Sequence, residues 1–348
     1  MKIAVYTIAL NEEQFVEPWF ESAKEADYLL IADTGSTDDT IKKAKALGIN
    51  VINVNVRPWR FDIARNAALA FIPLDIDLCI ALDMDEVLLP GWRQKLEAIP
   101  EGTTRPRYQY TWNWNPDGTP GLQYGGDKIH ARIGYRWKHP VHEVAVAYGV
   151  PEIQNWTDIE IHHHADNSKS RSQYLPLLNV AVQEDPYDDR NAHYYARELY
   201  FNGMLDEAAK EFRRHLALPT SRWGAERAWS LRYMSKCEPY KAIEHLNEAI
   251  KEAPEFREPY VDLAKVYYEA QDWANCLANA QKALSITEKP LVYLNEAEAW
   301  GWMPYDLAAI ASFRLGDTES ALRYGEKAVE LNPEDERLQK NLVYYKEA

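Results

Sequence analysis

The chain has 348 residues and a formal net charge of −15, with 46% hydrophobic and 27% charged residues. This length allows two hydrophobic cores, and no stretch approaches the roughly 20 apolar residues that a membrane span requires. The acidic balance argues against nucleic-acid binding, which depends on clustered Lys and Arg. The apolar run at residues 1–10 lacks the features of a signal peptide, so a cytoplasmic location is expected. Cys79, Cys237 and Cys276 form neither a disulfide framework nor a CxxC metal motif.

Short β-rich runs alternate with amphipathic stretches over the first 99 residues. This alternation predicts a parallel sheet covered by helices on both faces. Ligands of such sheets bind at the carboxyl ends of the strands. Strands are expected at residues 3–8, 27–33, 49–56 and 77–83, and helices at 12–26, 38–47, 62–72 and 92–99.

Residues 100–165 lose the helical pattern and are rich in Gly, Pro, Trp and Tyr. They predict strands joined by turns, such as the one at 115–118, where Pro fixes φ and Gly supplies a positive φ. Trp112, Trp114 and Tyr124 have two interpretations. They stack on a sugar ring, or they form a hydrophobic patch packed against the helices that follow.

After residue 170 the pattern becomes helical and repeats. Gly203, Cys237 and Gln271 follow one another at intervals of 34 residues, and Gly316 marks a fourth copy after an 11-residue insertion. Small side chains stand seven residues before each of these positions and five residues after it. They are Ala196, Ser230, Ala264 and Ala309 before, and Ala208, Ala242, Cys276 and Ala321 after. This period and pattern predict tetratricopeptide (TPR) repeats, whose paired helices approach closely.

Asp83 ends the apolar strand expected at 77–83, and Asp85 follows it two residues later. Two carboxylates on one side of a strand end suit Mg²⁺ or Mn²⁺, which bind oxygen ligands and bridge them to a diphosphate. Alternatively, such carboxylates cap helices or face water.

Four short motifs occur in order along the first 99 residues. Asn11-Glu12 follows the first strand, and residues 33–40 read D-x-G-S-x-D-x-T. Residues 61–68 read F-x-x-A-R-N-x-A, and residues 83–86 read D-x-D-E. In these motifs and their order the chain resembles family 2 glycosyltransferases of the GT-A type. The resemblance covers residues 2–99 and implies a GT-A nucleotide-diphospho-sugar transferase domain, Rossmann-like with a mostly parallel sheet. We expect this α/β domain at 1–168 and an all-α TPR superhelix at 169–348.

The resemblance also implies residues that bind the donor nucleotide. Asp33 matches the aspartate that binds the nucleobase. Thr7, Ile8 and Asn11 lie where the chain after the first strand lines the nucleotide. Arg65 matches the arginine that faces it. Residues 33–40 are equally consistent with the capped start of a helix, and the two roles are compatible.

The catalytic and metal-binding residues follow in the same way. Asp83 matches the acid near the ribose and donor sugar, and Asp85 the direct metal ligand. Glu143, in a V-H-E segment with His142, matches the position of a general base for an inverting transfer. The alternative is that this pair is buried and only shapes the cleft.

A histidine in an I-x-H segment often completes the metal shell in the resembling enzymes. Ile161-His162-His163 fits that segment best through His163, although the run of three histidines leaves His162 and His164 open as alternatives. An imidazole ligand favours Mn²⁺ over Mg²⁺.

These observations predict a glycosyltransferase that moves a sugar from a nucleoside-diphosphate sugar, with UDP favoured, to a peptide, protein or glycan acceptor. A TPR peptide-binding scaffold with an inactive GT-A domain is the alternative. A sugar nucleotidyltransferase ranks lower, because residues 8–13 lack the Gly-rich loop typical of those enzymes. The oligomeric state stays open.

Overall fold

The computed structural model describes residues 1–166 and 172–347. It divides into two compact units, Met1–Ala181 and Val182–Ala348. The domain boundary expected between residues 168 and 169 lies outside the described residues. Among the described helices, none combines the length and the apolar character needed to cross a bilayer.

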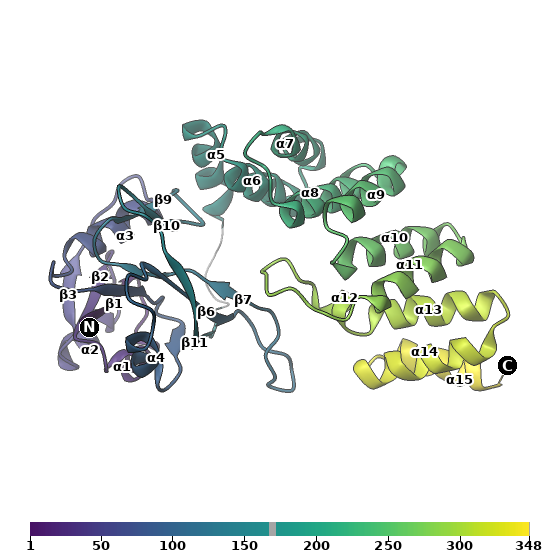
Figure 1. Ribbon diagram of the computed structural model, residues 1–348, viewed down its shortest axis with the longest axis horizontal. Coiled ribbons are helices and arrows are strands. Elements are labelled where there is room, and N and C mark those ends of the chain that lie inside the picture. Colours follow the sequence, from purple (N-terminus) through teal and green to yellow (C-terminus); the bar gives the residue numbers. More distant parts are fainter. Residues whose placement is uncertain (167–171, 348) are drawn as a thin grey trace. The chain divides into compact units, whose positions relative to one another are not determined.

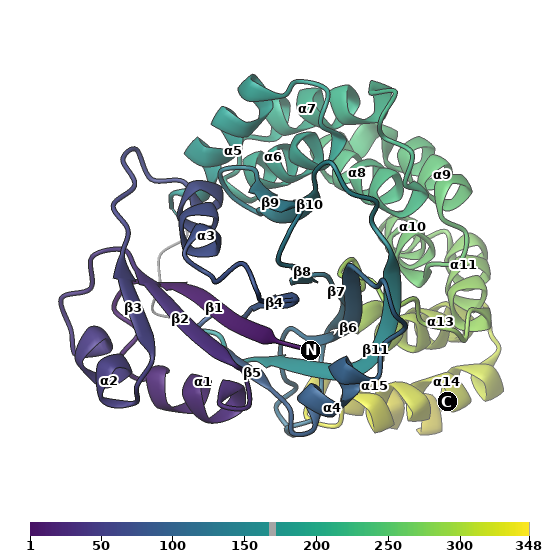
Figure 2. The ribbon, with the colours of Figure 1, turned by 60° about the vertical axis from the view of Figure 1, so that its left-hand side comes forward.

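The first unit is built on a five-stranded sheet in the order β3-β2-β1-β4-β8. Strands β1 to β4 run parallel, as the alternating pattern predicts, and β8 closes the edge antiparallel to β4 (Figure 2). The five strands are β1 (Ile3–Ala9), β2 (Tyr28–Asp33), β3 (Asn50–Asn53), β4 (Leu78–Ala81) and β8 (Ile129–Ala131).

Helices cover both faces of this sheet because side chains along each strand alternate in direction. Ile3 and Val5 of β1 belong to a buried cluster with Trp19 of α1, whereas Ala4 and Tyr6 pack with the α3 side chains. Figure 2 shows α3 on one face and α1 and α2 on the other. The helices of this unit are α1 (Val16–Ala23), α2 (Thr40–Ala46), α3 (Phe61–Ala70) and α4 (Trp92–Glu97).

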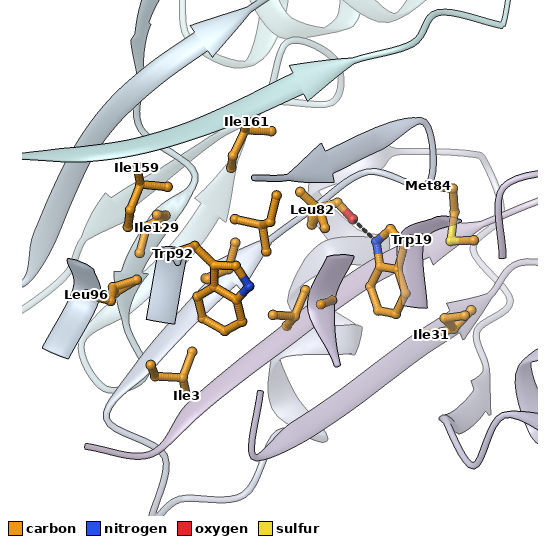
Figure 3. Packing of buried hydrophobic residues seen from close by; sticks show 14 of the residues in the cluster. Ile3, Trp19, Ile31, Leu82, Met84, Trp92, Leu96, Ile129, Ile159 and Ile161 are labelled. Atoms are coloured by element: carbon orange, nitrogen blue, oxygen red, sulfur yellow. Dashed lines mark hydrogen bonds between the residues drawn. The ribbon is translucent and has the colours of Figure 1, made fainter. Parts of the chain in front are cut away.

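A second, four-stranded sheet extends the first core. Its order is β5-β11-β6-β7, and Ile159 and Ile161 of β11 pack near Trp92 and Leu96 (Figure 3). The same face of β11 ends at the buried His163. The strands are β5 (Glu86–Leu88), β6 (Arg105–Thr111), β7 (Gln123–Gly126) and β11 (Gln154–His163), with a separate hairpin of β9 (Tyr135–Lys138) and β10 (Val144–Ala147).

The second unit is a series of antiparallel helix pairs (Figure 1). Helix α5 (Tyr174–Glu184) contains the division between the units. The other helices are α6 (Asp189–Phe201), α7 (Leu205–Ala217), α8 (Gly224–Cys237), η1 (Pro239–Lys241), α9 (Ala242–Glu252), α10 (Arg257–Glu269), α11 (Trp273–Ser285), α12 (Ala297–Trp300), α13 (Met303–Arg314), α14 (Thr318–Leu331) and α15 (Glu336–Glu347).

The repeat positions lie at or next to the turn between the two helices of each pair. Gly203, Gln271 and Gly316 lie at the turns within helix pairs, with φ of 76°, 58° and 86°. Cys237 instead ends α8, and η1 follows in place of a tight turn. The eight small side chains on either side of these positions are all buried. They let the two helices of each pair pack closely.

The 11-residue insertion before the fourth copy folds back onto α8. Leu294 joins the buried cluster around Trp229, and the Tyr293 hydroxyl donates to Glu226 at 2.7 Å. Glu296, next to α12, accepts two hydrogen bonds from the buried Arg232. The insertion is therefore part of the core of this unit.

Candidate active site

The carboxyl end of β4 holds the acidic segment that the sequence singles out. Leu82 continues the strand by donating its N–H to the Tyr6 carbonyl at 3.0 Å, and its own carbonyl accepts from the Trp19 indole (Figure 3). The chain then turns tightly, because the Glu86 N–H donates to the Asp83 carbonyl. Asp83 and Asp85 are thereby fixed at the ligand-binding edge of the sheet.

Arg65 joins Asp83 to Glu143. This α3 residue is 4% exposed, and its Nη2 donates to Asp83 Oδ1 at 2.6 Å while its Nε donates to Glu143. Burial acts to raise the pKa of Asp83, but the charges of Arg65 and Lys128 outweigh it and hold the pKa well below its usual range. Asp83 is therefore ionised at neutral pH.

One N–H group of the Arg65 guanidinium remains without a hydrogen bond within the described residues. Its Nη1 is buried and has no hydrogen-bond partner among the described residues. An unmatched buried donor costs about 1–3 kcal/mol. An anionic oxygen bound beside Arg65 would recover that cost, so this side chain fits a phosphate-bearing ligand.

Lys128 is a member of the site that the sequence analysis missed. Its ammonium donates to Asp83 Oδ2 and, at 2.8 Å, to Glu86 Oε1. Glu86 is 1% exposed, accepts from the Tyr110 hydroxyl at 2.6 Å, and accepts the Asp83 N–H at 2.8 Å. Lys128 thus ties the side chain of Asp83 to a buried carboxylate beneath it.

Asp85 pairs with His163. The pairing of β5 with β11 sets His163 opposite Glu86, and His163 Nε2 lies 3.3 Å from Asp85 Oδ2. The other ring nitrogen, Nδ1, donates to the Trp112 carbonyl at 2.8 Å. Burial acts to lower the pKa of His163, but the hydrogen bonds to Asp85 and to the Trp112 carbonyl raise it. The carbonyl fixes the ring so that Nε2 faces the carboxylate.

The neighbouring histidines do not share this arrangement. The Nε2 of His162 lies 3.5 Å from Glu160, and the pKa of His164 is lowered by burial and by its histidine neighbours. Only the His164 backbone meets the acidic segment, because its N–H donates to the Asp85 carbonyl at 2.7 Å. Of the three, His163 is the one whose imidazole faces Asp85.

The aromatic residues of 112–124 surround this pair. The Trp112 ring stacks on His163 with centroids 4.5 Å apart, and the Trp114 indole donates to the His163 carbonyl at 3.1 Å. Tyr124 contacts the Tyr110 ring. These contacts hold the histidine and the buried carboxylate in place.

The predicted nucleotide-binding residues lie at the ends of β1 and β2. Asp33 is 3% exposed and accepts the N–H groups of Gly35 and Ser36, so it shapes the loop after β2. Asn11, at φ 54°, accepts the Thr37 N–H at 2.8 Å and ties the loop after β1 to it. The D-x-G-S motif therefore forms a loop whose backbone N–H groups are held by the side chains of Asp33 and Asn11.

Thr7 and Ile8 lie in β1 itself. Thr7 is buried, and its hydroxyl donates to the Ile8 carbonyl at 3.1 Å. Ile8 is partly exposed near the end of the strand. Both lie on the sheet that carries Asp33 and Asp83.

The segment before Glu143 has an unusual backbone. His139 and His142 have φ of 83° and 51°, values that non-glycine residues seldom adopt. The Phe61 N–H donates to the Pro140 carbonyl, and Asn66 hydrogen-bonds both the N–H and the carbonyl of Trp137. These bonds anchor the segment to α3, which also carries Arg65.

A carboxylate from Asp85 and an imidazole from His163 are ligand types that suit a divalent ion such as Mn²⁺. The described residues contain no group of three or more His, Cys, Asp or Glu that would hold a metal ion. A metal at Asp85 and His163 would therefore need further oxygen ligands, which a diphosphate and water provide.

Comparisons with known proteins identify the domain. Residues 4–120 match the model of glycosyl transferase family 2. An uncharacterized glycosyltransferase of Rickettsia typhi is 31% identical over 108 residues, a match that spans 31% of this chain and 36% of that protein. The chain thus spans about a third of that relative.

Solved structures similar to each half were also found. Glucosyl-3-phosphoglycerate synthase from Mycobacterium tuberculosis, solved with Mn²⁺, UDP and glucosyl-3-phosphoglycerate, is 30% identical over 31% of this chain and 44% of that one, with a TM-score of 0.27. A TPR protein of Thermus thermophilus is 18% identical over 50% of this chain and 89% of that one, with a TM-score of 0.35. With TM-scores this low, the family rests on the sequence match and the repeat architecture on its helices and their spacing. The first unit therefore carries a region, residues 4–120, that matches glycosyl transferase family 2, and TPR-like helical repeats follow it.

Proposed function

We propose that this protein transfers a sugar from a UDP-sugar to an acceptor, with a divalent ion, Mn²⁺ in preference to Mg²⁺, held by Asp85 and His163. One observation carries the proposal. At the strand end that bears the Asp83–Arg65 ion pair, His163 turns its Nε2 toward Asp85, while the Trp112 carbonyl holds the other nitrogen. An anionic donor and a metal ion are the ligands that this set of groups would recognise.

Each predicted residue has a task in donor binding. Asp33 and the loop joined to Asn11 bind the nucleoside, beside Thr7 and Ile8 on β1. Arg65 presents its spare Nη1 to a phosphate oxygen. When bound, the metal ion would offset the charge of the diphosphate.

Glu143 serves as the general base in the proposed inverting transfer. Arg65 Nε holds one carboxylate oxygen, and the side chain of Glu143 is only 11% exposed. A carboxylate oriented in this way would accept the proton from the acceptor nucleophile as the new glycosidic bond forms. Asp83 lies on the other side of the same guanidinium and would orient the donor sugar and ribose.

The acceptor in this proposal is a peptide or protein side chain. The support is the array of helical repeats in the same chain, an architecture that commonly provides an extended binding surface. A location in the cytoplasm belongs to the same proposal.

Donor hydrolysis and transfer test this proposal with two variants. Asp85→Ala should lose Mn²⁺-dependent hydrolysis of the UDP-sugar and keep the far-ultraviolet circular dichroism of its helices. Glu143→Gln preserves a hydrogen-bond acceptor for Arg65, so it should still bind UDP but lose transfer. The exposed Glu21→Gln is the matched control. Unchanged hydrolysis in Asp85→Ala would refute the metal site, and normal transfer by Glu143→Gln would exclude Glu143 as the base.

A further inference from the structure

The pairing of β8 with β4 positions Lys128. Ile129 lies opposite Ile80 in an antiparallel register, and the Lys128 carbonyl accepts the Ala81 N–H at 3.0 Å. Ala81 is the last residue of β4. This backbone bond therefore sets Lys128 beside the carboxyl end of the strand, where a parallel sheet binds its ligand.

The Lys128 side chain is partly accessible. It is 25% exposed, close to the 30% of Asp83 and well above the 1% of Glu86. An ammonium has three N–H donors, and two of them bond to Asp83 and Glu86. The third has no hydrogen-bond partner among the described residues, and the ammonium also lies 5.9 Å from the centroid of the Tyr110 ring. A cation fixed by two carboxylates thus keeps one donor for a ligand.

Lys128 offsets part of the negative charge around it. Four carboxylates meet here, those of Asp83, Asp85, Glu86 and Glu143, against the two cations Arg65 and Lys128. A diphosphate brings further negative charge. Replacing Lys128 by a neutral side chain would leave Arg65 as the only fixed cation within this described network.

We propose that Lys128 is a further catalytic residue that binds the donor's diphosphate through its third N–H. This inference rests on the proposed function. In the transfer, the bond between the anomeric carbon and the phosphate oxygen breaks, and both electrons remain on that oxygen. The acceptor oxygen forms the new bond, and its proton passes to Glu143. Lys128 stabilises the charge that collects on the departing diphosphate, and no contact to Asp83 or Glu86 has to break.

A purely positioning role makes a different prediction. If Lys128 only held Asp83 in place, its loss would disturb binding of the nucleoside and of the diphosphate together. If Lys128 contacts the diphosphate, its loss would weaken UDP binding and spare uridine. The difference between the affinities for UDP and uridine therefore separates the two roles.

Isothermal titration with UDP and with uridine, both in the presence of Mn²⁺, measures this difference. Lys128→Met should weaken UDP binding about tenfold or more, the value of one charge-assisted hydrogen bond, and change uridine binding less than about twofold. Lys128→Arg should restore most of the UDP affinity. Lys24→Met, which removes an exposed lysine at the end of α1, is the matched control and should bind as the wild type does. Thermal melting establishes that each variant is folded.

The two ways of failing are distinguishable. If wild-type protein binds no UDP in the presence of Mn²⁺, the proposed function falls and this inference with it. If wild-type protein binds UDP but Lys128→Met binds it equally well, or loses UDP and uridine affinity to the same extent, the inference alone is wrong. Failure of Lys128→Arg to recover UDP affinity would also contradict a role carried by charge.

Discussion

Replacing Arg65 with methionine tests how the site and the core depend on each other. Methionine keeps the apolar stem of the side chain but removes the guanidinium, which lies between Asp83 and Glu143 and 4.9 Å from the centroid of the Trp137 ring. Removing one partner of a buried ion pair costs about 3–5 kcal/mol, because it leaves an uncompensated charge. We expect a loss of unfolding free energy in this range.

The loss should depend on pH in a defined direction. The pKa of Asp83 is lowered because Arg65 and Lys128 outweigh burial, so its stabilising contribution is present above its ordinary pKa of 3.8 and is lost as the pH falls through the folded value. Without Arg65, less positive charge opposes the effect of burial on the pKa of Asp83, so this pKa rises. Asp83 then takes up a proton, and loses its unpaired charge, at a higher pH than in the wild type. The difference between Arg65→Met and wild type should be largest near pH 7 and smaller near about pH 4.

Hydrogen exchange followed by mass spectrometry is the suitable assay, because peptides from β1 and β4 report the stability of the first unit separately from the repeats. Arg93→Met is the matched control. Arg93 also pairs with two carboxylates, Asp27 and Glu97, but both are well exposed, so the cost should stay near 1 kcal/mol or below. A cost below about 1 kcal/mol for Arg65→Met, or a cost that grows toward acidic pH, would refute this reasoning.

Three further predictions concern other parts of the structure. The pKa of His163 is raised, so its ion pair with Asp85 is complete below the ordinary value of 6.5 and is lost as the pH rises through the folded pKa. Mn²⁺ must displace the His163 proton, so Mn²⁺-dependent UDP affinity should fall with decreasing pH. A pH-independent affinity would contradict the assignment of His163 as a metal ligand. Leu294→Ala should lower the free energy of unfolding of the second unit by about 2–4 kcal/mol, measured by hydrogen exchange of α8, because Leu294 is only 4% exposed and packs in the cluster around Trp229. Exchange like that of the wild type would show that the packing of the insertion does not stabilise the unit. Gly126→Ala should destabilise the first unit by about 1–3 kcal/mol in the same measurement, since the added Cβ would lie 2.2 Å from the Tyr108 ring, and an unchanged stability would mean that the ring moves aside freely.

Local patterns in the sequence were sufficient for much of the first unit. Strands β1, β2 and β4 are short, mainly apolar runs, whereas β3 occupies only Asn50–Asn53 of the strand expected at 49–56. The acids of residues 83–86 follow directly from where the β4 run ends. The 34-residue spacing likewise predicted which small side chains are buried in the helix pairs. These features depend on neighbours within a few tens of residues, and local propensity and periodicity report them well.

The remaining members of the site depend on contacts between distant segments. Lys128 meets Asp83 only because β8 adds to the edge of the sheet at β4, and a lone lysine in a polar loop carries no signal of that pairing. Glu86 was noted only as the last residue of the D-x-D-E motif, and its burial beneath Tyr110 follows from the second sheet. The sequence favoured His163 over its neighbours through the I-x-H segment, but the reason its ring faces Asp85 is a backbone carbonyl at Trp112.

The most direct test of the central claim is a titration of the protein with UDP, with and without Mn²⁺, repeated with Asp85→Asn. The asparagine keeps the shape of the side chain and removes the charge that would bind the ion. We predict that Mn²⁺ strengthens UDP binding by at least about tenfold in the wild type and that this gain disappears in Asp85→Asn. Binding that is equally strong without the metal, or a gain that persists in the variant, would contradict the claim that Asp85 holds a metal ion for a nucleotide sugar.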